Sequence, residues 1–389
     1  MVRSKDCERV PELLRKLAAM LNWLRVGGAG RLSRGRETEP IACTQENHMY
    51  KLNSPDLRAV RRMVITTGAC LGALSLAFAS SVAWSADDWP ASGKTVRLII
   101  PSPGGSGTGD TIGRIFGEEL SRRLKVPFVI DNKAGANGII GATAAAKAPN
   151  DGYHFLFSWA GTLAVNPAMH KQLGYDSERD FAPIALLADV PNILVVNNDL
   201  PIKDFASFNQ YVKANPGKLS YGSTGIGSSM HLAGELYSRE FGAKMVHVPF
   251  SNPGNATTNL ISGEIGLMFQ LIPGIASQVK AGRVRAIGVM SPQRSPALPE
   301  VPTMVELGAP ELMSTTWFAL LAPKGTPPAV LQRVNVAANE AIADPAVRKR
   351  LGELGATPLG GTPKQLADHL SAEIERWGRI VRDAKIEVK

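Results

Sequence analysis

The stretch VRLIIPSPGGSGTGDTIGRIFGEEL, residues 96–120, predicts a strand, a glycine-rich loop and a helix in immediate succession. Val96–Ile100 is an apolar run of strand length, and the prolines and glycines that follow it end the strand. Apolar residues then recur at the three- and four-residue spacing of one helix face: Ile112, Ile115, Phe116, Leu120 and Leu124. This pattern is a βα unit, the repeating element of α/β proteins.

The same alternation of strands and helices continues along the chain in two series. We predict further strands at 126–130, 153–159, 192–196, 219–222, 245–248, 265–269, 284–290 and 317–321, most of them separated by helical patterns. From residue 327 to residue 386 the pattern is helical, with glycine and proline breaks at 355–363. Such alternation predicts a mainly parallel sheet that is covered by helices on both faces.

The two series predict an α/β protein with two αβ lobes. We expect residues 90–188 and 317–389 to form the first lobe and residues 189–316 to form the second. Ligands of such proteins bind at the carboxyl ends of the strands, so we expect the ligand in the cleft between the lobes.

Composition excludes several classes of function. The 389 residues are 44% hydrophobic and 20% charged, as in a globular protein. The net charge of +9 is concentrated in residues 1–85, so the rest of the chain carries only +3 and has no electrostatic footprint for nucleic acid. The three cysteines, Cys7, Cys43 and Cys70, also precede Ser85, so we expect no disulfide, zinc cluster or cysteine nucleophile in the body.

Residues 1–85 are predicted to be an N-terminal extension with a secretory signal. Residues 63–83 are uncharged and apolar and follow Arg61 and Arg62, which is the order of a signal peptide. Small residues place the cleavage after Ala83 or Ser85. The alternative is an uncleaved membrane anchor, and the true start stays open: Met1, Met49 or Met63. We expect a periplasmic protein.

Two glycine-rich loops each join a strand to the start of a helix. Loop 101–110 holds Ser106 and Thr108, and loop 223–229 lies in the other predicted lobe. Their backbone N–H groups and the positive end of each helix can bind an anion without a basic side chain. Each loop alone could also be no more than a tight connection between a strand and a helix. The glycines from Gly107 to Gly113 also resemble a dinucleotide-binding fingerprint, but the two prolines of the loop and the export signal disfavour that interpretation.

Residues suited to catalysis are scarce in the sequence. It contains no G-x-S-x-G elbow and no H-E-x-x-H motif, so we expect no catalytic residue, metal or cofactor. Asp110 could be an acid, but a carboxylate in a first helical turn more often acts as a cap. His231 could orient the second loop or be a structural residue. The rival hypothesis is an exported α/β enzyme that uses Asp110 or Ser228.

A set of short motifs occurs in one order along residues 89–386. They are Val96–Pro101 with Pro103–Gly105 and Asp110, Asp131–Asn132 with Ala134–Gly138, Asp151–Tyr153, Asp180–Pro183, Ser223–Ser228 with His231–Glu235, His247–Phe250, Ala281–Arg285, Leu298–Thr303 and Ala322–Pro327. In this order the sequence resembles the substrate-binding family of tripartite tricarboxylate transporters, the TctC or Bug family.

The resemblance implies a bilobed periplasmic binding protein of type II that captures a small carboxylate: a di- or tricarboxylate, an amino acid or an aromatic acid. It implies a monomer whose partner is the membrane permease of the transporter. The implied ligand-binding residues are Gly105, Ser106, Gly107, Thr108, Gly109, Asp110, Asn137, Gly138, Ser158, Thr162, Ser223, Thr224, Gly225, Gly227, Ser228 and Gln270. Gln270 stands where the family often has Asp, which leaves the identity of the carboxylate open.

Overall fold

The computed structural model describes residues 89–105 and 107–383, which belong to one compact unit of the chain. The predicted signal peptide, its cleavage sites and Ser106 lie outside the described residues. In the described part, no helix combines the length and the apolar character that crossing a membrane requires.

The first series of elements begins with the predicted βα unit. Its members are β1 (Val96–Ile100), α3 (Gly107–Leu124), β2 (Phe128–Asn132), α4 (Ile139–Ala146), β3 (His154–Trp159) and the short α5 (Asn166–Met169). The strands β2 and β3 both pair with β1 in parallel. Helix α3 begins at Gly107, so the first glycine-rich loop is shorter than the sequence predicts and its last residues are helical.

The second series follows the long strand β4 (Phe181–Asn197). Its members are α6 (Phe205–Ala214), β5 (Ser220–Ser223), α7 (Ser229–Phe241), β6 (Val246–Pro249), α8 (Pro253–Ile261), β7 (Leu267–Leu271), α9 (Ile272–Lys280) and β8 (Val284–Val289). Strand β5 pairs in parallel with β6 and β7. Helices α7 and α9 begin almost directly after β5 and β7, so each connection is a short loop at a carboxyl end of a strand.

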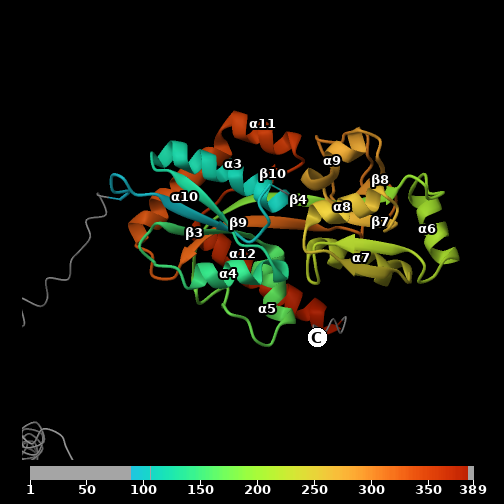
Figure 1. Ribbon diagram of the computed structural model, residues 1–389, viewed down its shortest axis with the longest axis horizontal. Coiled ribbons are helices and arrows are strands. Elements are labelled where there is room, and N and C mark those ends of the chain that lie inside the picture. The colour runs from blue at the N-terminus through green and yellow to red at the C-terminus, as the bar shows by residue number, and fades with distance from the viewer. Residues whose placement is uncertain (1–88, 106, 384–389) are drawn as a thin grey trace, which may run out of the picture. The chain divides into compact units, whose positions relative to one another are not determined.

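The last part of the chain returns to the first series. After β9 (Thr315–Pro323) come α10 (Pro328–Ala343), α11 (Pro345–Glu353), β10 (Thr357–Pro358) and α12 (Pro363–Asp383). Figure 1 shows α10, α11 and α12 on the same side of the molecule as α3 and α4, while α6 to α9 cover the other side. Arg123 at the end of α3 binds Asp344 at 2.8 Å, which ties α3 to the start of α11.

The prediction of a mainly parallel sheet is wrong for the centre of the molecule. The strand order is β2-β1-β3-β9-β4-β7-β5-β6, and β10 and β8 also pair with β4. Strand β9 is antiparallel to β3 and β4, and β4 is antiparallel to β7 and β8. Only the outer strands belong to βα repeats. The two central strands carry the chain between the halves, so no crossover helix imposes a parallel direction on them.

Strand β4 joins the two halves through a change of partner. Its residues up to Pro191 pair with β9, and its residues from Asn192 onward pair with β7. Lobe 1 is defined as β1–β3 with α3–α5 and α10–α12, and lobe 2 as β5–β8 with α6–α9. The exact lobe boundaries at residues 188/189 and 316/317 stay a prediction.

Candidate functional site

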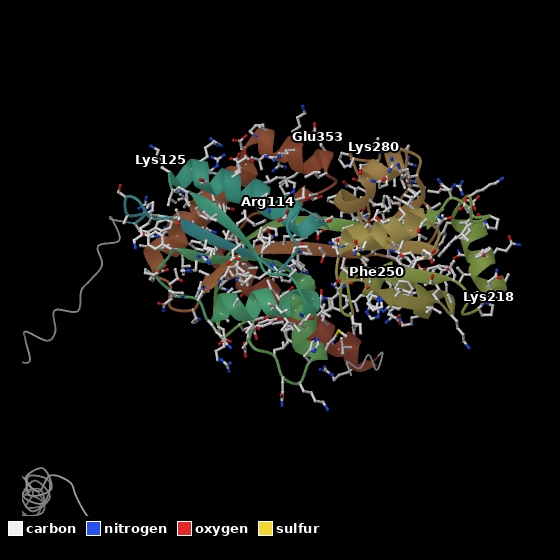
Figure 2. The ribbon with its side chains drawn as sticks, viewed as in Figure 1. Arg114, Lys125, Lys218, Phe250, Lys280 and Glu353 are labelled. Carbon is white, nitrogen blue, oxygen red and sulfur yellow. The ribbon has the colours of Figure 1, made fainter. Side chains whose placement is uncertain are left out.

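A cleft between the two lobes encloses about 800 Å³ of space, its open mouth included. Lobe 1 contributes the start of α3, the turn 135–138 and Trp159 at the end of β3, and lobe 2 contributes the starts of α7, α8 and α9. Among the described lining residues none is Asp, Glu, Lys or Arg. Figure 2 shows the labelled charged residues Lys125, Lys218, Lys280 and Glu353 at the periphery of the molecule.

Asp110 stabilises the loop before α3 through hydrogen bonds. Its carboxylate accepts hydrogen bonds from the Gly105 amide at 2.8 Å, from Arg114 Nε at 2.7 Å and from Asn132 Nδ2 at 2.8 Å. Burial opposes ionisation of Asp110, but these hydrogen bonds outweigh it and lower the pKa of the carboxyl. Asp110 is only 2% exposed and does not line the cleft, so it holds the loop in place as an ionised cap for Gly105.

The first turn of α3 presents backbone and one hydroxyl to the cleft. Gly107, Thr108 and Gly109 all line it. Their amides belong to the first helical turn, which has no acceptors of its own within the helix. A Cβ at Gly109 would lie 3.0 Å from the Trp159 ring, so the backbone lies directly against this aromatic wall. Thr108 Oγ1 is buried without a hydrogen-bond partner among the described residues.

The turn 135–138 carries backbone groups into the cleft in a left-handed conformation, with a φ of 48° at Asn137 and 89° at Gly138. Thr162 Oγ1 and Asn166 Nδ2 donate to the Asn137 carbonyl at 3.0 and 3.1 Å. Gly138 must be glycine here, because a Cβ would lie 2.2 Å from Thr162 Oγ1. Thr162 therefore supports the turn from behind and does not itself line the cleft.

The start of α7 is capped by its own loop. Ser228 Oγ donates to the Gly225 carbonyl at 2.7 Å and accepts from the His231 amide at 3.3 Å. The Gly227 amide donates to His231 Nδ1 at 3.2 Å, so His231 contacts the second glycine-rich loop directly. The amides of Ser229 and Met230 are the first two N–H groups of α7, and such groups have no acceptor within the helix. They are therefore available to donate hydrogen bonds to a ligand.

Two histidines lie beneath this loop with their ring centres 4.2 Å apart. Burial lowers the pKa of His231 to about 4, and burial together with the neighbouring His231 lowers the pKa of His247 to about 4. His247 Nε2 lies 2.6 Å from Ser223 Oγ. Both rings are therefore neutral at pH 7, and they contact the loop before α7 through Ser223 and Gly227 without lining the cleft.

Gln270 closes the cleft at the end of β7. Its Oε1 accepts a hydrogen bond from the Leu271 amide at 2.9 Å, and its side chain is 1% exposed. Its Nε2 is buried without a partner among the described residues. The apolar part of the lining comes from Trp159, Met230, Leu271 and Phe318, with several prolines.

The family model of the tripartite tricarboxylate transporter family receptor (TctC) matches residues 112–386, well over half of the chain. This chain belongs to the TctC family. The periplasmic binding protein BugD is a similar solved structure, 31% identical with a TM-score of 0.71; the match covers 76% of this chain and 99% of BugD.

Two further solved structures of similar proteins hold a ligand. Rpa4515 from R. palustris with adipate is 33% identical with a TM-score of 0.74, and the match covers 77% of this chain and 99% of Rpa4515. MatC from Rhodopseudomonas palustris with bound malate is 32% identical with a TM-score of 0.69, and the match covers 74% of this chain and 98% of MatC. The resemblance to the TctC family and the bilobed type II fold are thus confirmed.

The structure brings eight of the predicted site residues of this TctC-family protein to the cleft: Gly107, Thr108, Gly109, Asn137, Gly138, Thr224, Ser228 and Gln270. It places seven others outside the lining: Gly105, Asp110, Ser158, Thr162, Ser223, Gly225 and Gly227. Three of these seven, Asp110, Thr162 and Ser223, support the loops through the contacts described above. The contribution of any of these residues to binding stays a prediction.

Sequence reasoning missed much of the cleft lining. Trp159 lies next to the predicted site residue Ser158, but Phe318 and Thr316 come from β9, far along the chain. Ser251 and Pro253 come from the start of α8. A proline at the first position of a helix is a recognisable signal for a helix start, but nothing in the sequence shows that this start faces the other lobe.

The two lobes touch on both sides of the cleft. A Cβ at Gly107 in lobe 1 would lie 2.7 Å from Pro253 Cγ in lobe 2, and a Cβ at Gly227 in lobe 2 would lie 2.9 Å from Met169 Sδ in lobe 1. Glycine at these two positions permits the close approach. Within the described ranges, no cluster of His, Cys, Asp and Glu could hold a metal ion.

Proposed function

We propose that this TctC-family receptor captures a small carboxylate in the interlobe cleft and delivers it to the permease of a tripartite tricarboxylate transporter. One observation carries the proposal: helix starts from both lobes meet at a cleft whose described lining has no charged side chain. Backbone amides and the positive ends of α3 and α7 are suited to an anion, since each attracts negative charge. The adipate of Rpa4515 and the malate of MatC support a carboxylate in particular.

Binding without turnover is part of the proposal. Ser228 Oγ already donates to the Gly225 carbonyl, and His231 Nδ1 already accepts from Gly227, so the two do not form a nucleophile and base pair. Asp110 is held by Arg114 and Asn132. These contacts argue against the rival exported enzyme, which would need one of these groups free to act on substrate.

A ligand screen tests the proposal directly. Purified protein is heated with a panel of mono-, di- and tricarboxylates, amino acids and aromatic acids, and unfolding is monitored. A ligand at 100 times its Kd should stabilise the protein by about 2.7 kcal/mol. Stabilisation by a carboxylate without its consumption is the expected result. No carboxylate binding, or turnover of esters that is lost in Ser228→Ala, would overturn the proposal.

We also propose a monomeric receptor that is exported to the periplasm after removal of its signal. The exported form should begin near Trp84 or Ala86 and contain no cysteine. Intact mass measurement of periplasmic protein tests this. A protein that retained Met1 or Met49 in the periplasm would refute the proposed processing.

A further inference from the structure

The strongest unassigned feature of the cleft is a pair of buried polar groups at its α9 end. Gln270 Nε2 and Thr108 Oγ1 are both buried and have no hydrogen-bond partner among the described residues. Gln270 is 1% exposed and Thr108 is 5% exposed, and both line the cleft. Buried polar groups in native proteins are almost always hydrogen-bonded, so two such groups on residues of one cleft lining indicate a missing partner.

The orientation of the Gln270 amide is fixed by the backbone. Its Oε1 accepts the Leu271 N–H at 2.9 Å. If the amide were flipped, its NH₂ group would face this N–H, and two donors would oppose each other. The group directed away from Leu271 is therefore the NH₂, which only donates.

The Gln270 and Thr108 side chains approach one point from opposite lobes. A Cβ at Gly274, in the first turn of α9, would lie 3.5 Å from Gln270 Oε1 and 3.6 Å from Thr108 Oγ1. Thr108 belongs to the first turn of α3 in lobe 1, and Gln270 is the last residue but one of β7 in lobe 2. A ligand group that bonds both side chains would bridge the lobes.

We infer that Gln270 and Thr108 form a subsite for a second acceptor group of the ligand, so that this receptor selects dicarboxylates and rejects acids that carry an ammonium group. The inference rests on the proposed function, because it assigns the other end of a carboxylate ligand. An ammonium group needs several acceptors, but the unpartnered atom of Gln270 is its NH₂ nitrogen, and its Oε1 already accepts from the Leu271 amide. No Asp or Glu is among the described lining residues. The adjacent start of α9 also repels a cation.

Two series of probes that differ only at one end test the inference. The six-carbon series is adipate, hexanoate and 6-aminohexanoate, and the four-carbon series is succinate, butyrate and 4-aminobutyrate. Within each series the far end is a carboxylate, a methyl group or an ammonium group. Titration calorimetry of the full exported protein should give at least tenfold tighter binding of the dicarboxylate than of either partner in one of the series.

Three variants then assign the preference to the subsite. Gln270→Glu keeps the shape and the acceptor for Leu271 but replaces the NH₂ by oxygen, so dicarboxylate binding at pH 8 should weaken at least tenfold and the amino acid of that series should gain. Gln270→Met and Thr108→Val should weaken the dicarboxylate but not the monocarboxylate. Gln293→Glu adds the same charge at an exposed position and is the matched control.

The outcomes separate this inference from the proposed function. If in both series the monocarboxylate or the amino acid binds as tightly as its dicarboxylate, the subsite is wrong while carboxylate capture stands. If dicarboxylate preference survives in Gln270→Met and in Thr108→Val, the second acceptor is held elsewhere and the inference is overturned. If none of the six probes binds, the inference is overturned as well, and the wider screen of acids decides the proposed function.

Discussion

The amide of Ser229 provides a sharp test of anion binding by the start of α7. It is the first N–H of the helix, at the rim of the cleft, and Ser229 lines that cleft. Proline at this position removes the N–H without breaking the helix, since the first helical position tolerates proline. The preceding residue, Ser228, has a φ of −69° and a ψ of 155°, which a following proline permits.

The expected loss follows from the hydrogen bond that Ser229→Pro removes. A hydrogen bond to a charged group contributes about 1.5–3 kcal/mol, so Kd for a bound carboxylate should rise roughly 10- to 150-fold. Ser229→Ala is the matched control, because it removes the hydroxyl and keeps the amide. The assay is calorimetric titration with whichever of adipate or malate binds better, together with the melting temperature of the ligand-free proteins.

The comparison has a clear negative outcome. If Ser229→Pro and Ser229→Ala bind the acid within twofold of each other while both melt like the unmodified protein, the α7 amide does not hold the ligand. The anion would then be bound by lobe 1 alone or by side chains. Lys133→Ala is a useful companion, because Lys133 lies outside the cleft lining, pairs with Asp131 and should leave affinity unchanged.

Two further predictions concern closure and pH. The Cβ of Gly227→Ala would lie 2.9 Å from Met169 Sδ of the other lobe, so this variant should weaken carboxylate binding severalfold and reduce ligand-induced compaction in small-angle scattering. The control is Gly217→Ala, which has a similar φ of 73° and no atom within 4 Å of its Cβ, and which should change neither property. His231, with a folded pKa near 4 against the ordinary 6.5, binds its proton more readily in the unfolded chain, so its own contribution to the free energy of unfolding should fall by about 2 kcal/mol from pH 7 to pH 5 and stay nearly level above pH 7. His247, whose pKa is also lowered to about 4, adds a fall in the same direction. Urea unfolding at the two pH values checks this, and an equally steep fall in His231→Asn, which keeps an acceptor for Gly227, would count against it.

The repeating βα units could be predicted from the sequence because their signals are local. The strand Val96–Ile100 was predicted residue for residue, and the helix starts after both glycine-rich loops were found within a few residues. Strand β4 was predicted only for residues 192–196, whereas it begins at Phe181 and contains Pro183 and Pro191, a residue type that is rare inside a sheet. The structure tolerates irregularity there through register shifts against β9, and such shifts depend on a strand that is distant in sequence.

The site was harder to predict than the fold because the sequence does not show which side chains of a loop face the cleft and which face away from it. The sequence indicated which loops reach the cleft, but Asp110, Thr162 and Ser223 turned out to support those loops from behind. Which side a side chain takes depends on the hydrogen bonds that it can make, and its partners come from other segments. Asn166 donates a hydrogen bond to the Asn137 carbonyl, but no sequence motif predicts this role.

In a cleft that binds an anion through backbone amides, affinity and specificity come from different groups. The amides of α3 and α7 are present whatever the side chains are, so they can hold a carboxylate group but cannot distinguish one acid from another. Discrimination must come from the side chains that face the rest of the ligand, and among these Thr108 and Gln270 carry buried polar atoms without a partner in the described part of the chain. Because these two side chains come from different lobes, a ligand that satisfies both also stabilises the closed arrangement of the lobes. Selection of the acid and closure of the receptor are thereby coupled through the same two side chains.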